Sequence, residues 1–292
     1  NVAEQILGAN IQNQALLPLI VIPEKSVKGD FDLGYTTYPG IGHSKVDGTG
    51  LYNLSVLNNA LTPINKLTII DVLPFVGDKN LVSAQDGSYP ARDTEFPVTL
   101  SGPITVPSGF TVYYTSTAPI DGLAAYDAIA AWETSPLDYS QVRAFKIVMD
   151  NGVTIPTQES RLYSFGVDTP NDYSTAEKIA WNSFGLSIDG GMTYNEPNKV
   201  GLEITAYQLE GTSFFDTDKD GNYDAGESAI PGVLVELLDQ NDQILKTTTT
   251  DANGYYIFNI DLPGQYKVRM TTPEGLTITN YQPIVFDETV SS

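Results

Sequence analysis

The sequence predicts an all-β protein made of two tandem β-sandwich domains, the second of them small. Short runs rich in β-branched and aromatic residues recur along the chain, separated by Gly, Pro and Asn. Long helix-forming runs are few, and 292 residues are enough to bury two separate cores. This pattern is typical of antiparallel sandwiches.

The composition narrows the function classes. The 15 basic and 36 acidic residues give a formal charge of −21, which repels nucleic acid and anionic lipid and attracts divalent cations. There is no cysteine, so disulfides and thiolate chemistry are excluded. The single histidine, His43, lies in a Gly-rich stretch and is expected in a turn. A histidine-based triad or multi-histidine metal centre is therefore not predicted.

Residues 1–24 are expected to be an N-terminal segment or the tail of a preceding module. Their apolar run, 15–23, is too short and too rich in proline to cross a bilayer, so we expect no membrane insertion. It also lacks the basic flank of a signal peptide, and the chain therefore reads as a fragment of something longer.

Residues 25–210 are predicted to form the larger sandwich. Its expected strands lie at 51–57, 67–73, 97–100, 110–114, 142–149, 161–167, 184–188 and 200–209. Two short helices are also predicted. One covers the Ala-rich stretch Asp121 to Trp132, and the other follows the capping box that begins at Ser174 and runs to Trp181.

A twelve-residue acidic loop, 216–227, is the strongest motif in the chain. Its spacing is that of an EF-hand calcium loop, with a glycine at position 6, and the predicted ligands are Asp216, Asp218, Asp220, Asn222 (through its carbonyl), Asp224 and Glu227. The alternative is a solvated acidic turn. Five carboxylates against one lysine leave a charge of 1 − 5 = −4, and the repulsion among these carboxylates without a cation favours Ca²⁺. Strand patterns on both sides indicate a structural clip rather than a helical sensor.

Residues 211–283 are predicted to be the small second domain, followed by a C-terminal linker, 284–292. Strands are expected at 233–238, 244–250, 255–260 and 266–272. In the last of these, Tyr266, Val268 and Met270 share one face, as in a half-buried strand. A domain this small gains stability if calcium binds its folded form.

Several motifs of the second domain occur in one order. They are the loop 216–227, Ile230-Pro231-Gly232-Val233, Thr248-Thr249-Thr250-Asp251-Ala252-Asn253-Gly254-Tyr255-Tyr256, Pro263-Gly264-Gln265-Tyr266 and Thr272-Pro273-Glu274-Gly275. In these motifs the segment from about Gly211 to Pro283 resembles the B-type repeats of serine-aspartate-repeat (Sdr) adhesins of Gram-positive bacteria. The resemblance implies a calcium-binding, collagen-adhesin B-type (prealbumin-like) sandwich that serves as a stalk segment of a wall-anchored protein.

The first region is similar, more loosely, to adhesin-type β-sandwich repeats found beside such domains. The phrases that carry this similarity are Lys25-Ser26-Val27-Lys28-Gly29-Asp30, Thr37-Tyr38-Pro39-Gly40, Asp71-Val72-Leu73-Pro74-Phe75-Val76-Gly77-Asp78 and Ala180-Trp181-Asn182-Ser183-Phe184. They indicate a setting at the cell surface rather than an activity.

Relatives of the B-type fold often carry a lysine–asparagine isopeptide bond assisted by a buried acid. In the second domain Phe214 and Phe215 stand where the lysine would be expected and Met270 where the acid would be, so no such bond is predicted there. In the first domain Lys28 with Asn182 is a candidate pair, because one lies early and the other late in the domain. The assisting acid would be Asp30, Asp71 or Glu203.

Two further sets of residues have a structural and a functional interpretation. Asp251 and Asn253, with Asp239 or Asp242, could hold a second calcium, but an Asn-Gly hairpin turn is the favoured interpretation. The second set could line a ligand groove, although aromatics on alternating strands more often belong to a core; it comprises Trp132, Trp181, Tyr113 and Tyr114.

The function predicted first is a non-enzymatic stalk or adhesion segment, located extracellularly on a Gram-positive cell wall and flanked by further domains of a longer protein. A second hypothesis is a module whose first domain binds a host extracellular-matrix protein or a glycan. A third is a glycan-acting enzyme with a calcium-stabilised accessory domain. No catalytic residue can be proposed, because the acid pairs are too numerous to single one out and no nucleophile lies beside a base.

Overall fold

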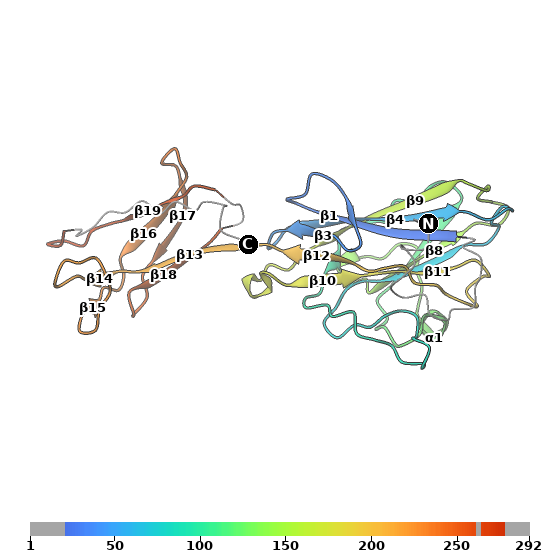
Figure 1. Cartoon of the computed structure of the whole chain (residues 1–292), viewed down its shortest axis with the longest axis horizontal. Helices are drawn as coiled ribbons and strands as arrows, with labels where there is room; N and C mark the ends of the chain where they lie inside the picture. Colours follow the sequence, from blue (N-terminus) through green and yellow to red (C-terminus); the bar gives the residue numbers. More distant parts are fainter. Residues whose placement is uncertain (1–20, 261–263, 278–292) are drawn as a thin grey trace, which may run out of the picture. The chain divides into compact units, whose positions relative to one another are not determined.

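The computed structural model describes residues 21–260 and 264–277, and the chain divides into two compact units, Asn1–Thr205 and Ala206–Ser292 (Figure 1). The division lies a few residues before the expected boundary at 210. Of the expected N-terminal segment 1–24, residues 1–20 lie outside the described part, and the rest begin the first strand. The expected linker 284–292 also lies outside the described residues.

In residues 21–205 of the first unit, the regular secondary structure is almost entirely strand. The strands are β1 (Val21–Gly29), β2 (Thr36–Thr37), β3 (Ile41–Ser44), β4 (Thr49–Asn58), β5 (Thr68–Val72), β6 (Thr99–Leu100), β7 (Phe110–Thr115), β8 (Ala144–Met149), β9 (Ser160–Asp168), β10 (Ile179–Asn182), β11 (Gly185–Ser187) and β12 (Val200–Ile204). The helical elements are α1 (Leu123–Ile129) and two single 3-10 turns, η1 (Tyr139–Gln141) and η2 (Tyr173–Thr175).

Two larger sheets of the first unit enclose its core. One has the order β2-β1-β4-β9-β6 and the other β11-β5-β8-β7, while a three-stranded sheet has the order β10-β12-β3. Phe145 of β8 contacts Phe165 of β9 edge to face, with ring centroids 4.9 Å apart, and Phe165 stacks on Tyr52 of β4. Aromatic side chains from both sheets therefore meet between them, as in a β-sandwich. The pairing is antiparallel except between β12 and β3.

The burial of alternate residues explains these strands. In β4 Tyr52, Leu54 and Val56 are completely buried, and the residues between them are partly exposed. This is the period-2 pattern of a strand with one face on a core. All five residues of β5 are buried, as expected for a strand covered on both faces.

Of the two predicted helices, the structure forms only one. Helix α1 lies within the Ala-rich stretch 121–132. The prediction of a helix after Ser174 was wrong: a single 3-10 turn at 173–175 is followed by β10. Asp172, rather than Ser174, caps that turn by accepting a hydrogen bond from the Ser174 amide. Glu177 then has a positive φ of 58°, which ends any helical path.

The described residues of the second unit, 206–260 and 264–277, form seven strands. They are β13 (Tyr207–Thr212), β14 (Phe214–Phe215), β15 (Ser228–Ala229), β16 (Leu234–Leu238), β17 (Ile244–Thr249), β18 (Tyr255–Ile260) and β19 (Lys267–Met270). They pair as β13-β18, β14-β15 and β17-β16-β19. The core consists of Leu209, Val235, Leu237, Tyr256, Phe258 and Ile260, with Tyr266, Val268 and Met270 packed against it. The predicted all-β class with two tandem sandwiches is thus confirmed.

The expected strand 200–209 is divided between the units. Residues 200–204 form β12 of the first, and Leu209 lies in β13, which pairs with β18 of the second. Within the described residues, no helix is long and apolar enough to cross a membrane.

Candidate functional sites

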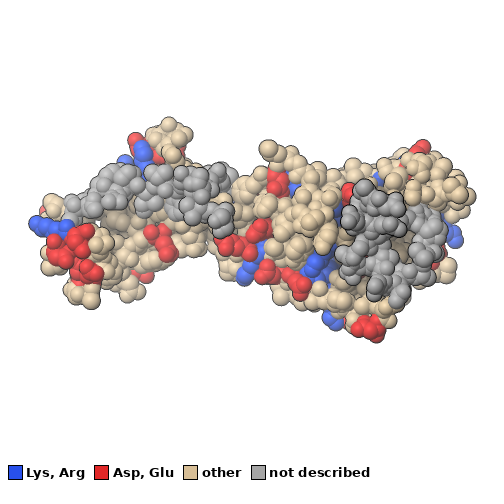
Figure 2. Space-filling model, viewed as in Figure 1, with Lys and Arg blue, Asp and Glu red and all other residues tan. Residues whose placement is uncertain are grey.

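The acidic loop 216–227 connects β14 and β15. These two short strands pair antiparallel, with Phe214 opposite Ala229 and Phe215 opposite Ser228, so they bring the first and last residues of the loop together. Figure 2 shows a gathering of acidic side chains at this end of the second unit. The loop therefore joins strands, as predicted from the sequence.

Backbone amides hold the first and last acids of the loop in place. The carboxylate of Asp216 accepts hydrogen bonds from the amides of Lys219 (2.7 Å), Asp220 and Gly221. Gly221, the sixth residue, has φ 84°, a conformation that favours glycine. Glu227 accepts hydrogen bonds from the amides of Thr217 (2.7 Å) and Asp224 (3.1 Å), which closes the loop.

The structure brings the five predicted acids together. Oxygens of Asp216, Asp218 and Glu227 lie within 4.8 Å of one another, as do oxygens of Asp218, Asp220 and Asp224. Asp218 belongs to both groups. The neighbouring carboxylates, Asp220 first, raise the pKa of Asp224, because each negative charge makes ionisation of the next less favourable.

This arrangement fits a calcium ion. Two oxygens on opposite sides of Ca²⁺, each about 2.3–2.6 Å from it, stand about 5 Å apart, which agrees with the spacing of the carboxylates. The side chain of Asn222 is used within the loop, since its amide nitrogen donates to Asp220 (3.0 Å), and its backbone carbonyl is the group left for a metal. The loop offers oxygen ligands alone, as hard cations prefer.

Two acids of the alternative second metal site, Asp239 and Asp251, cap turns. Asp251 accepts hydrogen bonds from the amides of Asn253 (2.8 Å) and Tyr255 (2.9 Å), and Gly254 has φ 70°. Asp239 caps the preceding turn, and Asp242 pairs with Lys267 at 2.7 Å. In the described part of the chain, the clusters able to hold a metal all lie within 216–227. These contacts support the hairpin-turn interpretation.

The aromatic candidates do not line a common groove. The Lys146 ammonium lies over both Tyr113 (5.6 Å) and Trp132 (4.6 Å), and the Lys199 ammonium lies 4.7 Å from the centre of Trp181. Tyr114 is buried, and its hydroxyl accepts a hydrogen bond from the Ile104 amide. Each of these three half-buried rings thus has a lysine of the same chain over one face, and Tyr114 lies in the core.

His43 lies in strand β3 rather than in a turn. It is exposed, with Nδ1 3.1 Å from Asp32 and Nε2 3.6 Å from Glu203. Both ring nitrogens thus face carboxylates, and the absence of a catalytic role for His43 stays a prediction.

A lysine that the sequence analysis did not select is completely buried in the first unit. In β1 Lys25, Val27 and Gly29 face the core, and the residues between them are partly exposed. The Lys25 ammonium lies 5.0 Å from the ring centre of Tyr52 and 5.1 Å from that of Phe165. Lysine is almost never fully buried unless it is paired. Its partner is Asp71.

Asp71 belongs to strand β5 and is also fully buried. Its Oδ2 lies 2.5 Å from Nζ of Lys25. Asn182, the last residue of β10, is buried close by, and the proximity of its side-chain amide lowers the pKa of Asp71. Among the described residues, Asp71 Oδ1 and Asn182 Nδ2 are both buried without a hydrogen-bond partner. Such orphaned polar atoms are rare in native proteins, and these two belong to one cluster.

Burial changes the protonation of this pair. It lowers the pKa of Lys25 to about 8, against the opposing attraction of Asp71, and nearby Arg92 lowers it further. Burial also raises the pKa of Asp71, a change that Lys25 partly offsets. With a pKa of about 8, about a tenth of the Lys25 side chains are neutral at pH 7, several hundred times more than for an exposed lysine. A desolvated, neutral lysine is a nucleophile.

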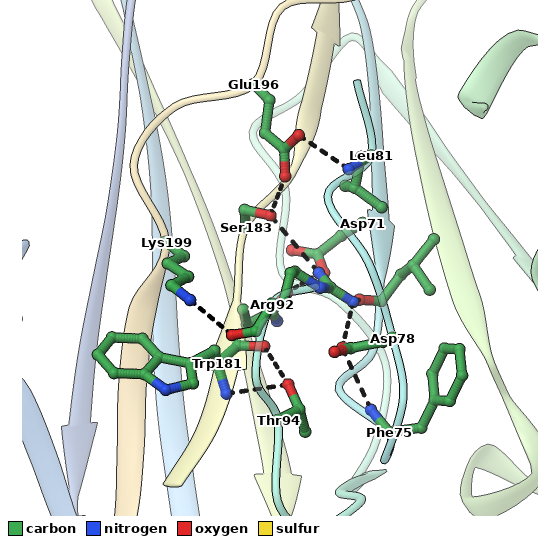
Figure 3. Close-up of polar contacts among 12 residues, drawn as sticks. Asp71, Phe75, Asp78, Leu81, Arg92, Thr94, Trp181, Ser183, Glu196 and Lys199 are labelled. Atoms are coloured by element: carbon green, nitrogen blue, oxygen red, sulfur yellow. Dashed lines mark hydrogen bonds and ion pairs between the residues drawn. The ribbon is translucent and has the colours of Figure 1, made fainter. Parts of the chain in front are cut away.

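Arg92 completes the cluster and is fully buried as well. Its guanidinium pairs with Asp78 at 2.6 Å and donates to the carbonyl of Val72 at 3.2 Å. On its other side Nη1 lies 3.4 Å from Oδ1 of Asn182 and 3.5 Å from Oγ of Ser183. Figure 3 shows the guanidinium between Asp78 and Ser183, with Asp71 beside it.

The structure places Lys25, and not the predicted Lys28, in the buried cluster that contains Asp71 and Asn182. Lys28 is partly exposed on the opposite face of β1. Of the three proposed acids, Asp30 accepts hydrogen bonds from Ser44 and Thr49, and Glu203 lies near His43. Only Asp71 contacts the buried lysine. The signal was present in the alternation of β1, in which Glu24, Ser26, Lys28 and Asp30 form the polar face and Lys25 falls on the apolar one.

The comparison with protein families addresses the second unit. Residues 207–291 match the model of the SdrD B-like domain. The second unit is an SdrD B-like domain. The predicted resemblance to Sdr B-type repeats is therefore confirmed, and the candidate calcium loop lies inside the matched residues.

The curated proteins similar to this chain include serine-aspartate repeat-containing proteins. Serine-aspartate repeat-containing protein D of Staphylococcus aureus is 35% identical over 129 residues, which cover 42% of this chain and 10% of that protein. Serine-aspartate repeat-containing protein I of Staphylococcus saprophyticus is 43% identical over 99 residues, covering 34% and 5%. The chain thus spans about a tenth or less of these relatives.

Solved structures with a similar arrangement include two pilins. The major pilin subunit BcpA of Bacillus cereus aligns with a TM-score of 0.44 at 12% identity, covering 92% of this chain and 67% of that one. Domains D2 and D3 of the major pilin SpaD of Corynebacterium diphtheriae align with a TM-score of 0.41 at 14% identity, covering 87% and 84%. The curated relatives named here are serine-aspartate repeat-containing proteins and their names describe no enzyme, in agreement with the predicted non-enzymatic chain.

Proposed function

We propose that this chain is a stalk segment of a Gram-positive cell-surface protein, in which each domain carries its own clip against unfolding. In the SdrD B-like domain the clip is calcium held by the loop 216–227. In the first domain it is an amide bond between Lys25 and Asn182. The observation that carries the proposal is the convergence of five carboxylates on a loop whose first and last acids are already held by backbone amides.

The calcium ion would be bound by the side chains of Asp216, Asp218, Asp220, Asp224 and Glu227, with the Asn222 carbonyl. It would neutralise the mutual repulsion of these carboxylates and tie β14 to β15. The loop is exposed and contains few apolar side chains, so without a cation it is held by the amide hydrogen bonds to Asp216 and Glu227 and by the contact of Tyr223 with Phe214. Binding to the folded form alone stabilises that form by mass action.

The amide bond would follow from the buried cluster. The neutral amine of Lys25 attacks Cγ of Asn182, and a new C–N bond forms as the bond from Cγ to Nδ2 breaks. Asp71 takes a proton from the amine and passes it to the leaving nitrogen, which departs as ammonia. The reaction removes the orphaned Nδ2 and leaves one amide N–H to face Asp71. This happens once per chain, so it requires no catalytic turnover.

A simple buried ion pair is the competing interpretation of Lys25 and Asp71. Such pairs are weak evidence of stability, because the cost of desolvation offsets the attraction. The position of Asn182 favours the amide bond, since an ion pair alone has no use for a buried carboxamide whose nitrogen has no hydrogen-bond partner. The mass of the intact chain distinguishes the two.

The cell-surface setting rests on the SdrD B-like domain and on the Sdr relatives. Binding of a host protein or glycan by the first domain gains no support, because its aromatic candidates are buried or covered by lysines.

Thermal unfolding with and without calcium tests the proposal. At a calcium concentration 100 times the dissociation constant, binding contributes about 2.7 kcal/mol, which corresponds to roughly 10–20 °C in the melting temperature of a domain of this size. We expect chelation to lower the transition of the SdrD B-like domain by that amount and to expose residues near 220 to protease. The transition of the first domain serves as the internal control. Equal melting with calcium and with chelator would refute the proposed clip.

A further inference from the structure

We propose that Arg92 promotes amide-bond formation between Lys25 and Asn182 by stabilising the negative charge that develops on Oδ1 of Asn182. This inference rests on the proposed bond and assigns a role to a buried residue that the reaction scheme above does not use.

The orientation of the Asn182 side chain supports this role. A guanidinium carries only hydrogen-bond donors, so the group that faces Arg92 must be the carboxamide oxygen, and Nη1 lies 3.4 Å from it. The carboxamide nitrogen is then left for the side of Asp71, whose carboxylate oxygens only accept. The two ends of the reacting carboxamide thus meet different partners: a cation at the oxygen and a base near the leaving nitrogen.

Arg92 is fixed before any reaction occurs. Asp78 holds it at 2.6 Å, the Val72 carbonyl accepts from the same nitrogen at 3.2 Å, and the Lys199 ammonium donates to the backbone carbonyl of Arg92 at 2.6 Å. The guanidinium is fully buried. A donor held in a dry site needs no reorganisation when charge appears, which is why preorganised donors at a developing oxyanion accelerate acyl transfer.

Arg92 also acts on the nucleophile. The charged and titratable groups that affect Lys25 are Asp71 on β5, Arg92 and Glu196, while Tyr52 on β4 and Phe165 on β9 cover the ammonium. Asp71 and Glu196 raise the pKa of Lys25, and Arg92 lowers it. The same cation therefore favours the neutral amine and stabilises the attacked carbonyl, whereas Glu196 is turned to Ser183 and to the amides of Leu81 and Val82.

The simpler interpretation is that Arg92 only neutralises Asp78. A buried carboxylate does need a partner, and burial raises the pKa of Asp78. That role accounts for the Nη2 contacts but not for the placement of Nη1 against the one carboxamide oxygen of the cluster. The two roles predict different rates of bond formation, so they can be separated.

The test uses full-length chain recovered unfolded from inclusion bodies in urea, with its mass checked against the sequence before use. The chain is diluted to refold, and the appearance of the species lighter by one ammonia is followed by intact-mass spectrometry between pH 6 and 10. The wild type is compared with R92M/D78N, which removes both charges together. D78N is the matched control, because it keeps Arg92 and removes the same carboxylate.

We expect D78N to form the bond within about threefold of the wild-type rate. R92M/D78N should be slower than D78N by about 100-fold or more, the usual loss on removing an oxyanion donor. The pH at which its rate reaches half of the maximum should also move upward, because Lys25 loses a neighbouring positive charge. Loss of the Arg92 charge shifts that midpoint by itself, so the role at Asn182 is read from the rate well above the midpoint, where Lys25 is neutral in both variants.

Equal rates for D78N and R92M/D78N would overturn the inference while leaving the amide bond intact. A wild type that folds without losing ammonia would instead refute the bond itself. If R92M/D78N does not fold, R92K decides the matter, since it keeps a cation opposite Asp78 but is too short to donate to both Asp78 and Asn182. Bond formation by R92K at the wild-type rate would overturn the role of Arg92, and a loss of at least tenfold would support it.

Discussion

The proposed amide bond between Lys25 and Asn182 would make a large stability difference that can be measured directly. The bond would close a loop of roughly 160 residues between positions 25 and 182. In the chain-entropy model of a cross-link, a loop of that size removes about 5 kcal/mol of freedom from the unfolded chain. For a domain of this length, each kcal/mol corresponds to about 2–4 °C, so the first domain should melt roughly 10–20 °C higher with the bond than without it.

The perturbation is the double variant K25M/D71N. Methionine fills the space of the lysine stem, and asparagine replaces the carboxylate, so no buried charge is left unpaired. Replacing a buried ion pair by uncharged residues is often neutral or stabilising, so a fall in melting temperature would report the lost cross-link rather than the lost charges. K28M is the control, because Lys28 lies on the opposite face of the same strand.

The assay combines intact-mass spectrometry with differential scanning calorimetry. We expect wild type and K28M to be lighter than their sequences by one ammonia, and K25M/D71N to have its full sequence mass and a lower first-domain transition. The transition of the SdrD B-like domain should be unchanged. A wild type of full sequence mass, or a bonded wild type that melts within about 2 °C of K25M/D71N, would refute the reasoning.

Three further predictions concern calcium, pH and force. E227Q weakens the ligand at position 12 of the loop and should lower the calcium affinity at least about tenfold, as measured by isothermal titration calorimetry. D242N changes a different acidic turn and should leave the calcium affinity unchanged. Equal affinities of the two variants would argue against the loop. The rate of amide-bond formation on refolding should rise about tenfold per pH unit up to about pH 8 and then level off, because the reactive form is neutral Lys25 and its pKa is about 8. A rate independent of pH between 6 and 8 would show instead that the proton moves within the Lys25–Asp71 pair. When the first domain is unfolded by force, the bonded wild type should extend by on the order of 500 Å less than K25M/D71N, as measured by single-molecule stretching. Equal extensions would contradict the cross-link.

The fold class was predictable because strand periodicity and turn residues are local signals. The loop 216–227 was predictable for the same reason, since all its ligands come from twelve consecutive residues and its glycine meets a local backbone requirement. The helix predicted after Ser174 shows where local reasoning fails. Its residues have a helix-start signal, but β10 gains more by pairing with β12 and burying Ala180 and Asn182. Tertiary packing there overrides the local preference.

The buried cluster could not be assembled from the sequence alone. Lys25, Asp71, Arg92 and Asn182 come from distant parts of the chain and meet only when the sheets pack. Asn182 and Asp71 were named as candidates, yet the lysine named with them, Lys28, lies three residues from the buried Lys25 and on the polar face of β1. In a strand a shift by an odd number of residues moves a side chain to the other face. Arg92 lies outside any strand and carries no pattern that distinguishes it from a surface arginine.

The position of the cluster within the first domain explains why a bond there would suit a stalk. Lys25 lies near the start of β1, and Asn182 lies on β10, which pairs with β12, the last strand before the boundary at Thr205. A pull on the two ends of this domain would pass through the amide bond and the short stretches outside it. Strands β4, β5, β8 and β9 lie inside the closed loop and would carry no tension along the chain. The domain then needs little thermodynamic stability to resist extension, because a covalent bond, rather than its hydrogen bonds, takes the load.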